Sequence, residues 1–442
     1  LVPLDDERIW YRYHHLFADL LRIQLQRRRD AQGVAQLHIR AADWHAHYGS
    51  ILEAIHHASR ATDDERVERF VEQHYREMAT RGEMAGMRSW IGSLSQDRVY
   101  RRPWLCMYEA LSHAWFGELD EADQLLEQAE KRMRSEDPDT PAMLAHLNYV
   151  KSRVTAMRGD IQQAIQFCLK AREHIPADNL SLQSDTGITL GYEYFLSGDY
   201  ANASQVLEEV IRSGMATGAI TNTVAASCVM ARLYAVQGLL NKAYDTYRMA
   251  GQAIPEESDQ HRGAMALVEV GIADVLCEWN DLDGALAYIK QGLALMPMWD
   301  KADDLALAYV TLARIHRAQA NWRAALEAMG KAIQLIQTRG VFSEAHDVVE
   351  TTQVKLWLAL GDMKAAKRWA APRQERLSAD DRFGVDHELA YITLARVWIA
   401  QHKFHEAIGL LAHLEETARA SRRMGRVIAI LRLKALALQA MG

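Results

Sequence analysis

The sequence contains few of the residues that interrupt helices. Its 442 residues include 25 glycines and 8 prolines, whereas alanine and leucine are abundant. Because glycine and proline are the least favourable residues in a helix interior, this composition favours helix throughout. A chain of this length exceeds what one compact core accommodates, so either several domains or an elongated array is expected.

Cysteines and long apolar runs are also scarce. Four cysteines stand far apart without a Cys-x-x-Cys pair, and we expect them to be reduced packing residues: Cys106, Cys168, Cys228 and Cys277. No apolar run approaches the roughly 18 residues that a membrane span needs. Charged residues stand near the N-terminus, where a secretory signal would be apolar. These features predict a cytoplasmic protein without a membrane partner.

Positive charge is not in excess either. The formal net charge of -7 argues against a chain that wraps nucleic acid through a pervasive positive field. The basic stretches Arg27–Arg29 and Arg419–Arg426 are more typical of solvated helix ends than of DNA contacts.

A repeat with a period of about 40 residues organises the chain. In each copy an anchor residue is followed five positions later by alanine. The strong copies are Gly117/Ala122, Gly159/Ala164, Gly198/Ala203, Gly238/Ala243 and Gly361/Ala366. The weaker copies are Asn280/Ala285, Ala320/Ala325 and His402/Ala407. A fixed period of this size indicates a solenoid of helical hairpins.

The positions around each anchor explain how a hairpin packs. A small residue stands seven positions before most anchors and a bulky one four positions before, as Ala231 and Tyr234 do for Gly238. Small residues at minus seven and plus five let two antiparallel helices approach closely. Glycine at the anchor permits the left-handed turn that ends the first helix. A proline at plus seventeen, such as Pro176, cannot continue a helix and closes the hairpin.

This layout resembles the tetratricopeptide repeat. The period exceeds that family's 34 residues. We expect the excess in long loops between hairpins, such as Ser135–Pro141, Pro176–Gly187 and Pro372–His387. The predicted fold class is all-α, a right-handed superhelix of tetratricopeptide-like hairpins.

The first residues do not follow the repeat. Two β-prone runs flank a charged, turn-like stretch, and an amphipathic helix is expected from about His15 to Arg29. The stretch Leu4–Leu21 resembles the end of the winged-helix module in large ATP-binding LuxR-type transcriptional regulators, the STAND-class group of the maltose-regulon activator. The segments Leu37–Trp44 and Glu53–Ala58 are similar to the helical pair that follows that module.

The resemblance implies three parts. Residues 1–30 are the end of a winged-helix module, residues 31–100 are short-period hairpins, and residues 101–442 are a sensor superhelix. Gly442 falls on an anchor position, so the array is expected to be truncated within a repeat. The chain has no G-x-x-x-x-G-K-[ST] phosphate loop. ATP is therefore expected only in a missing domain of a longer parent, and DNA contact only through a missing C-terminal domain.

The resemblance also implies a function. An inducer, or a peptide or protein partner, would bind the superhelix and control self-association of the parent transcriptional activator. The alternative is a tetratricopeptide scaffold that binds a peptide or protein partner without sensing a small molecule. Enzyme activity is not expected, because no catalytic arrangement is recognisable. The 18 histidines lack convergent metal-ligand companions, so neither a metal nor a cofactor is expected in this chain.

Candidate ligand-binding residues stand six positions before the anchors. In tetratricopeptide arrays this offset faces the concave surface, which the resemblance implies here too. The candidates are Arg153, Tyr192, Arg232, Asp274, Arg314, Lys355 and Arg396. One hypothesis is that this basic stripe holds an anionic or carboxylate-bearing ligand through arginine forks. The other is that the arginines pair with acidic neighbours and pack their stems between helices.

A second candidate site is aromatic. Trp279, Trp299 and Trp322 are expected near the loops of neighbouring hairpins. Their rings could stack on a sugar or another flat ligand. The alternative is that they cap the apolar core between helices.

Overall fold

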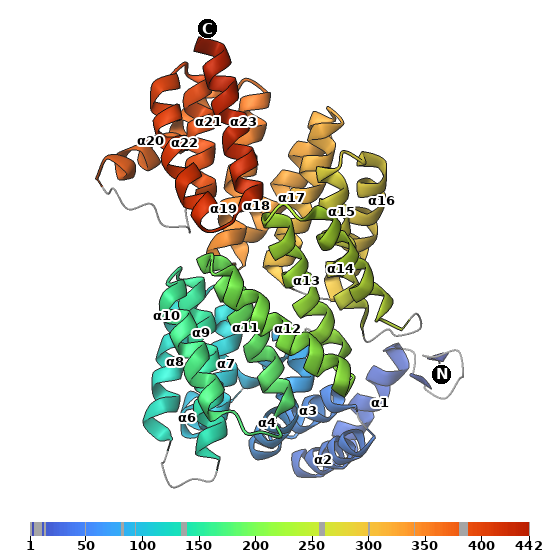
Figure 1. The fold of residues 1–442 in the computed structure, drawn as a ribbon. Coiled ribbons are helices and arrows are strands. Elements are labelled where there is room, and N and C mark those ends of the chain that lie inside the picture. The colour runs from blue at the N-terminus through green and yellow to red at the C-terminus, as the bar shows by residue number, and fades with distance from the viewer. Residues whose placement is uncertain are drawn as a thin grey trace. The chain divides into compact units, whose positions relative to one another are not determined.

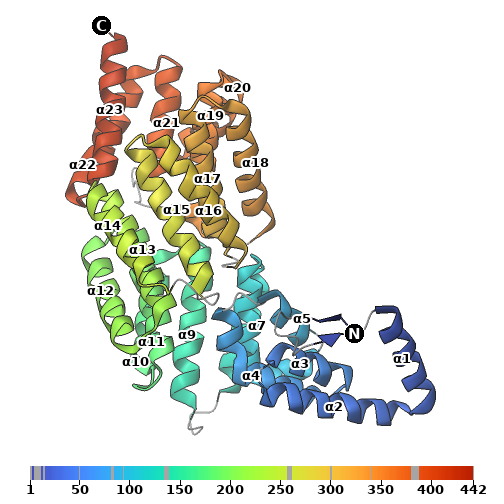
Figure 2. The same cartoon turned by 90° about the vertical axis from the view of Figure 1, so that its right-hand side faces the viewer.

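The computed structural model describes residues 2–3, 11–12, 15–48, 50–80, 84–92, 94–133, 139–255, 261–298, 301–339, 341–379 and 388–441. The chain divides into two compact units, Leu1–Glu109 and Ala110–Gly442. Almost all described residues lie in helices, as Figures 1 and 2 show. None of the described helices is both long and apolar enough to cross a membrane.

The first unit begins with two short antiparallel strands, in which Val2 pairs with Arg12 and Pro3 with Tyr11. In the packed helices that follow, Ala42, Ile55 and Val71 are fully buried. The elements are β1 (Val2–Pro3), β2 (Tyr11–Arg12), α1 (His15–Arg28), α2 (Ala31–His47), α3 (Ile51–Arg60), α4 (Asp64–Thr80), α5 (Met84–Ile91) and α6 (Gln96–Arg101). The division between the units falls within the next helix, α7 (Pro103–Trp115). The expected helix near the start is therefore present as α1.

The second unit is a series of helical hairpins. Each odd-numbered helix from α9 to α21 packs against the helix that follows it. The elements are α8 (Leu119–Arg132), α9 (Thr140–Met157), α10 (Ile161–His174), α11 (Leu180–Ser197), α12 (Tyr200–Thr217), α13 (Ile220–Val236), α14 (Leu240–Gln252), α15 (Arg262–Glu278), α16 (Leu282–Leu295), the 3-10 turn Met296–Met298, α17 (Ala302–Ala318), α18 (Trp322–Thr338), α19 (Ser343–Ala359), α20 (Met363–Ala379), α21 (Glu388–Ala400), α22 (Phe404–Ala420) and α23 (Met424–Met441).

All eight anchors adopt the left-handed backbone conformation that ends a helix. The five glycines have φ between 78° and 91°. The three weaker anchors do the same, with φ of 62° at Asn280, 56° at Ala320 and 62° at His402. The alanines five positions later are all fully buried between the two helices of their hairpins. The repeat pattern therefore identified the hairpin turns even where glycine is replaced.

The residue after an anchor often starts the next helix. Asp160, Asp199 and Asp362 accept a hydrogen bond from the backbone N–H three residues later, at 3.0, 3.2 and 3.0 Å. Asp281 and Asn321 do the same at 3.1 and 3.3 Å. These N-caps satisfy amides that have no partner within the helix, so each hairpin turn ends one helix and starts the next.

The long period has a different cause from the one expected. The helices α11 and α12 are each 18 residues long, and only Gly198 and Asp199 separate them. Gly187 lies inside α11, where a Cβ would approach Val210 Cγ2 to 2.5 Å. Pro372 lies inside α20 and not in a loop. The predicted loops are therefore wrong where α11 covers Leu180–Gly187 and where α20 covers Pro372–Ala379, because tertiary packing continues the helices through these residues. Residues 380–387 of the second loop lie outside the described residues.

The last helix returns to an earlier hairpin of the same unit. The N-terminal end of α23 packs against α13, as Figure 2 shows. A Cβ on Gly425 would lie 2.8 Å from the carbonyl oxygen of Val236, so this approach requires glycine. The contact brings the start of α23 to the face on which the first helices of the hairpins meet.

Candidate functional site

The first helices of the hairpins line a partly open cavity of about 980 Å³ in the second unit. It lies at the upper end of the range of roughly 300–1,000 Å³ that small-molecule sites occupy. Every candidate residue at minus six lines it: Arg153, Tyr192, Arg232, Asp274, Arg314, Lys355 and Arg396. The structure thus gathers along one cavity side chains that lie up to 243 positions apart in sequence (396 − 153).

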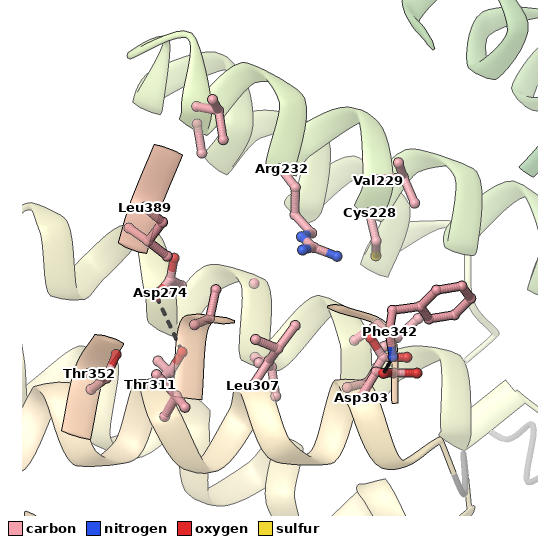
Figure 3. Close-up of a pocket in the computed structure, with 18 of the residues that line it drawn as sticks. Cys228, Val229, Arg232, Asp274, Asp303, Leu307, Thr311, Phe342, Thr352 and Leu389 are labelled. Atoms are coloured by element: carbon pink, nitrogen blue, oxygen red, sulfur yellow. Dashed lines mark hydrogen bonds between the residues drawn. The ribbon is translucent and has the colours of Figure 1, made fainter. Parts of the chain in front are cut away.

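Local packing explains why these side chains face the cavity. The residue just before each of them, such as Ala231 before Arg232 or Ala395 before Arg396, is buried in its hairpin. Adjacent residues on a helix point in different directions. The long side chain at minus six therefore projects past the buried seam, and Figure 3 shows Arg232 pointing from α13 into the cavity.

Arg232 is paired across the cavity by an acid from a distant repeat. Its Nη2 lies 2.8 Å from both carboxylate oxygens of Glu344, near the start of α19. The hydroxyl of Tyr192 on α11 donates to the same carboxylate at 2.6 Å. Three hairpins are therefore joined by one carboxylate whose side chain is 22% exposed.

Phe342, two residues before Glu344, enters the cavity beside this carboxylate. Its ring lies edge-on to Tyr192, with centroids 5.6 Å apart, and the guanidinium of Arg153 lies 5.7 Å from its centre. Its backbone N–H donates to Asp303 at 2.7 Å, as drawn in Figure 3. Burial, and then the neighbouring Asp304, raise the pKa of Asp303 to about 7. We call Phe342–Glu344 the crossing segment.

Arg314 is also paired. Its guanidinium binds the carboxylates of Asp274 and Glu278 on α15, and Thr311 donates to Asp274 at 3.2 Å. Asp274 holds the pKa of Arg314 above its ordinary value. For Arg232 and Arg314 the geometry is that of the second interpretation, in which the arginines pair with acidic neighbours.

The other end of the stripe is different. In the part of the chain that the structure describes, neither Lys355 nor Arg396 has a carboxylate within ion-pair distance. Burial, and then the charges of neighbouring arginines, lower the pKa of Lys355 to about 7. Burial, followed by Arg432 and Arg317, lowers the pKa of Arg396 to about 10. The stripe therefore consists of a neutralised centre and a cationic end.

Two of the three tryptophans proposed for stacking lie away from this cavity. Trp279 is 41% exposed at the end of α15, and its ring centre lies 5.2 Å from that of Tyr244. Trp322 is 37% exposed at the start of α18. Neither lines the cavity. Trp299 lies outside the described residues.

Sequence reasoning missed several cavity residues. The crossing segment carried no repeat signal, because it lies between copies. Arg317 and Arg432, by contrast, were visible in the repeat as arginines at offsets where the other copies have uncharged residues. Arg317 stands three positions before its anchor, where the other copies have Ala114, Ala156, Phe195, Ala235, Cys277, Leu358 and Ile399. Arg432 stands at minus ten, where the other copies have Met107, Tyr149, Ile188, Cys228, Val270, Val310, Thr351 and Ile392.

No group of three or more His, Cys, Asp or Glu side chains within the described ranges is arranged to hold a metal ion. The cavity instead combines apolar walls with arginine, lysine and carboxylate groups. Stacked hairpins with such an inner cavity define a tetratricopeptide-like superhelix.

The chain belongs to the family described as the MalT-like TPR region, whose sequence model matches residues 145–442. The model of the MalT winged helix domain matches residues 1–33. These matches confirm the resemblance to the LuxR-type regulators and the all-α repeat fold. The boundaries at residues 30 and 100 stay a prediction, since the division of the structure falls at 109.

Similar proteins include the HTH-type transcriptional regulator MalT of Serratia proteamaculans, 24% identical over 424 residues. The MalT of Yersinia enterocolitica is 25% identical over 432 residues. Both alignments cover 94% of this chain and 46% of the relative, so the chain spans about half the length of these regulators. Among solved structures, NprR in complex with its cognate peptide NprX matches with a TM-score of 0.50 and 12% identity, covering 89% of this chain and 97% of that one. This last likeness concerns the fold alone.

Proposed function

We propose that this chain is the effector-sensing and protein-interaction superhelix of a cytoplasmic, ATP-dependent transcriptional activator of the LuxR type. An inducer or partner binds in the cavity and controls self-association of the parent regulator. ATP and DNA bind in domains outside this chain. The family membership supports the regulatory role, and the cavity supports the sensing role.

The observation that carries the proposal is the convergence of successive repeats on one cavity. Glu344 joins Tyr192 and Arg232 from two other hairpins. In an array of this kind each repeat otherwise contacts its neighbours, so a ligand that changes one such cross-cavity contact shifts the arrangement of several hairpins together. A binding event can therefore be transmitted along the array.

The alternative, a scaffold that takes a peptide without an inducer, is supported by one comparison. NprR, which shares the fold, has been solved in complex with its cognate peptide NprX. An extended peptide would follow the row of minus-six residues, whereas a small molecule would occupy part of the cavity. The two proposals differ in which class of compound stabilises the chain.

A thermal-shift screen of the 442-residue chain tests both. Small metabolites and short peptides are compared, since a compound that binds the folded state raises its apparent stability. The double variant Val229→Trp/Leu307→Trp narrows the cavity from α13 and α17, where Figure 3 shows both residues. The control is Leu326→Trp on α18, at a residue that is 46% exposed.

A metabolite whose stabilisation is lost in the double variant and kept in the control supports the sensor. Stabilisation by peptides alone, with the same pattern of loss, supports the scaffold. Ligands that stabilise the double variant as well as the unaltered chain would refute the cavity as the binding site.

A further inference from the structure

Four cations from four successive first helices lie together at one end of the cavity. Arg317 comes from α17, Lys355 from α19, Arg396 from α21 and Arg432 from α23, and all four line the cavity. Arg317 and Arg432 replace residues that are uncharged at the same offsets in the other copies. Packing of the helical repeat therefore does not require arginine at these two positions.

These cations lack the partners that the neighbouring arginines have. Arg232 binds Glu344, and Arg314 binds Asp274 and Glu278. Among the described residues, no carboxylate pairs with any of the four cations. The buried Nε atoms of Arg317 and Arg396 have no hydrogen-bond partner there either. Arg317, Lys355 and Arg396 are partly buried, whereas Arg432 is exposed. Burying a cation without a partner costs free energy, and this cost falls on the first three.

The four groups also repel one another. Burial first, and then Arg314 and Arg432, lower the pKa of Arg317, while Cys277 and Glu278 act in the opposite direction without reversing the shift. The groups that face Lys355 from the other elements are Arg314 and Arg317 on α17, Arg396 on α21 and Arg426 on α23. None of these is an acid. A cluster that is costly in the free chain is typical of a site whose charge is balanced by a ligand.

We propose that Arg317, Lys355, Arg396 and Arg432 bind the phosphoryl group of a phosphorylated small molecule, which deepens the proposed sensing function and rests on it. Arginine forks match phosphate oxygens in bidentate geometry, and a phosphoryl group brings up to two negative charges to one point. The apolar side chains of Leu389, Ile392 and Ile428 line the same end of the cavity and contact the uncharged remainder.

Isothermal titration of the full chain with inorganic pyrophosphate tests this assignment. Ionic strength is held constant with KCl, because general screening also acts on clustered charges. The variants Lys355→Met and Arg396→Gln each remove one cation and are expected to weaken pyrophosphate binding about 10- to 100-fold, as for lost charged hydrogen bonds. The matched control Arg323→Gln removes a cation whose side chain is 92% exposed on α18, and binding should be unchanged.

Thermal stability of the free variants separates a ligand site from a structural one. Removing an unpaired, repelled cation should leave the midpoint of the free chain unchanged or raise it, while the shift caused by pyrophosphate is lost. If both variants instead lower the midpoint and keep the pyrophosphate shift, the cations are structural and the assignment is wrong.

Two further results would overturn it. One is stabilisation by pyrophosphate no greater than by KCl at equal ionic strength. The other is tighter binding of the dicarboxylate succinate than of pyrophosphate. A different outcome would separate the two proposals. If an uncharged ligand binds the unaltered chain and Lys355→Met but not Val229→Trp/Leu307→Trp, the phosphoryl site is rejected and the sensing function stands.

Discussion

Replacing Glu344 by glutamine tests the contact that joins three hairpins across the cavity. Glutamine keeps an oxygen that can accept from Tyr192 but leaves the guanidinium of Arg232 without its counter-charge. Hydrogen bonds to charged groups contribute about 1.5–3 kcal/mol, and breaking a buried ion pair costs about 3–5 kcal/mol. The two side chains are 28% and 22% exposed, so we expect a loss of about 2–3 kcal/mol.

Equilibrium urea unfolding of the full chain, followed by circular dichroism, measures this loss. Glu327→Gln is the control, because Glu327 forms an exposed pair with Arg323 at 3.0 Å and such pairs contribute about 0–1 kcal/mol. A double-mutant cycle of Glu344→Gln with Arg232→Met should give a coupling energy of at least about 1 kcal/mol. If the two single losses add within about 0.5 kcal/mol, the contact between α13 and the crossing segment contributes nothing and the reasoning fails.

Three further predictions concern packing and buried charge. Gly425→Ala should destabilise the chain by about 1–3 kcal/mol, because the added methyl group would clash with α13. Gly409→Ala, which has open space around it, should stabilise the chain by about 0.5–1 kcal/mol. The midpoints of urea unfolding of the two variants test both values. The pKa of Lys355 is about 7 in the folded chain and ordinarily 10.5, so between these pH values the unfolded chain binds the proton that the folded chain has lost. The free energy of unfolding should therefore rise from pH 7 towards pH 10.5, and Lys355→Met should lack that rise when urea unfolding is measured at both pH values. Arg423→Met should cost about 3–5 kcal/mol, because it removes the closer partner of the buried Glu388, at 2.9 Å, and leaves Arg426 at 3.7 Å; full stability of this variant in urea would contradict that role.

The repeat pattern predicted the fold in some detail because it records contacts between neighbouring helices. The buried alanines and the left-handed anchors follow from it, even at Ala320 and His402. The pattern also predicted which face carries the cavity residues. It could not predict whether those residues are paired, because pairing depends on the crossing segment.

The contact between Arg232 and Glu344 spans 112 positions, and no local rule encodes it. It exists because successive hairpins bring helices of different repeats around the same cavity. Helix length was also outside the pattern, since Pro372 and Gly187 are accommodated by packing that single-residue propensities do not include. Arg317 and Arg432 were visible in the sequence as exceptions at two offsets, and comparing every offset across the copies would have found them.

The most direct test of the cavity as the binding site is hydrogen exchange of the full chain with and without pyrophosphate. We predict slower amide exchange in α17, α19, α21 and α23, which supply the four cations, and no change in α16, α18 or α20. Protection confined to those second helices, or unchanged exchange at a concentration that saturates the calorimetric titration, would contradict the account.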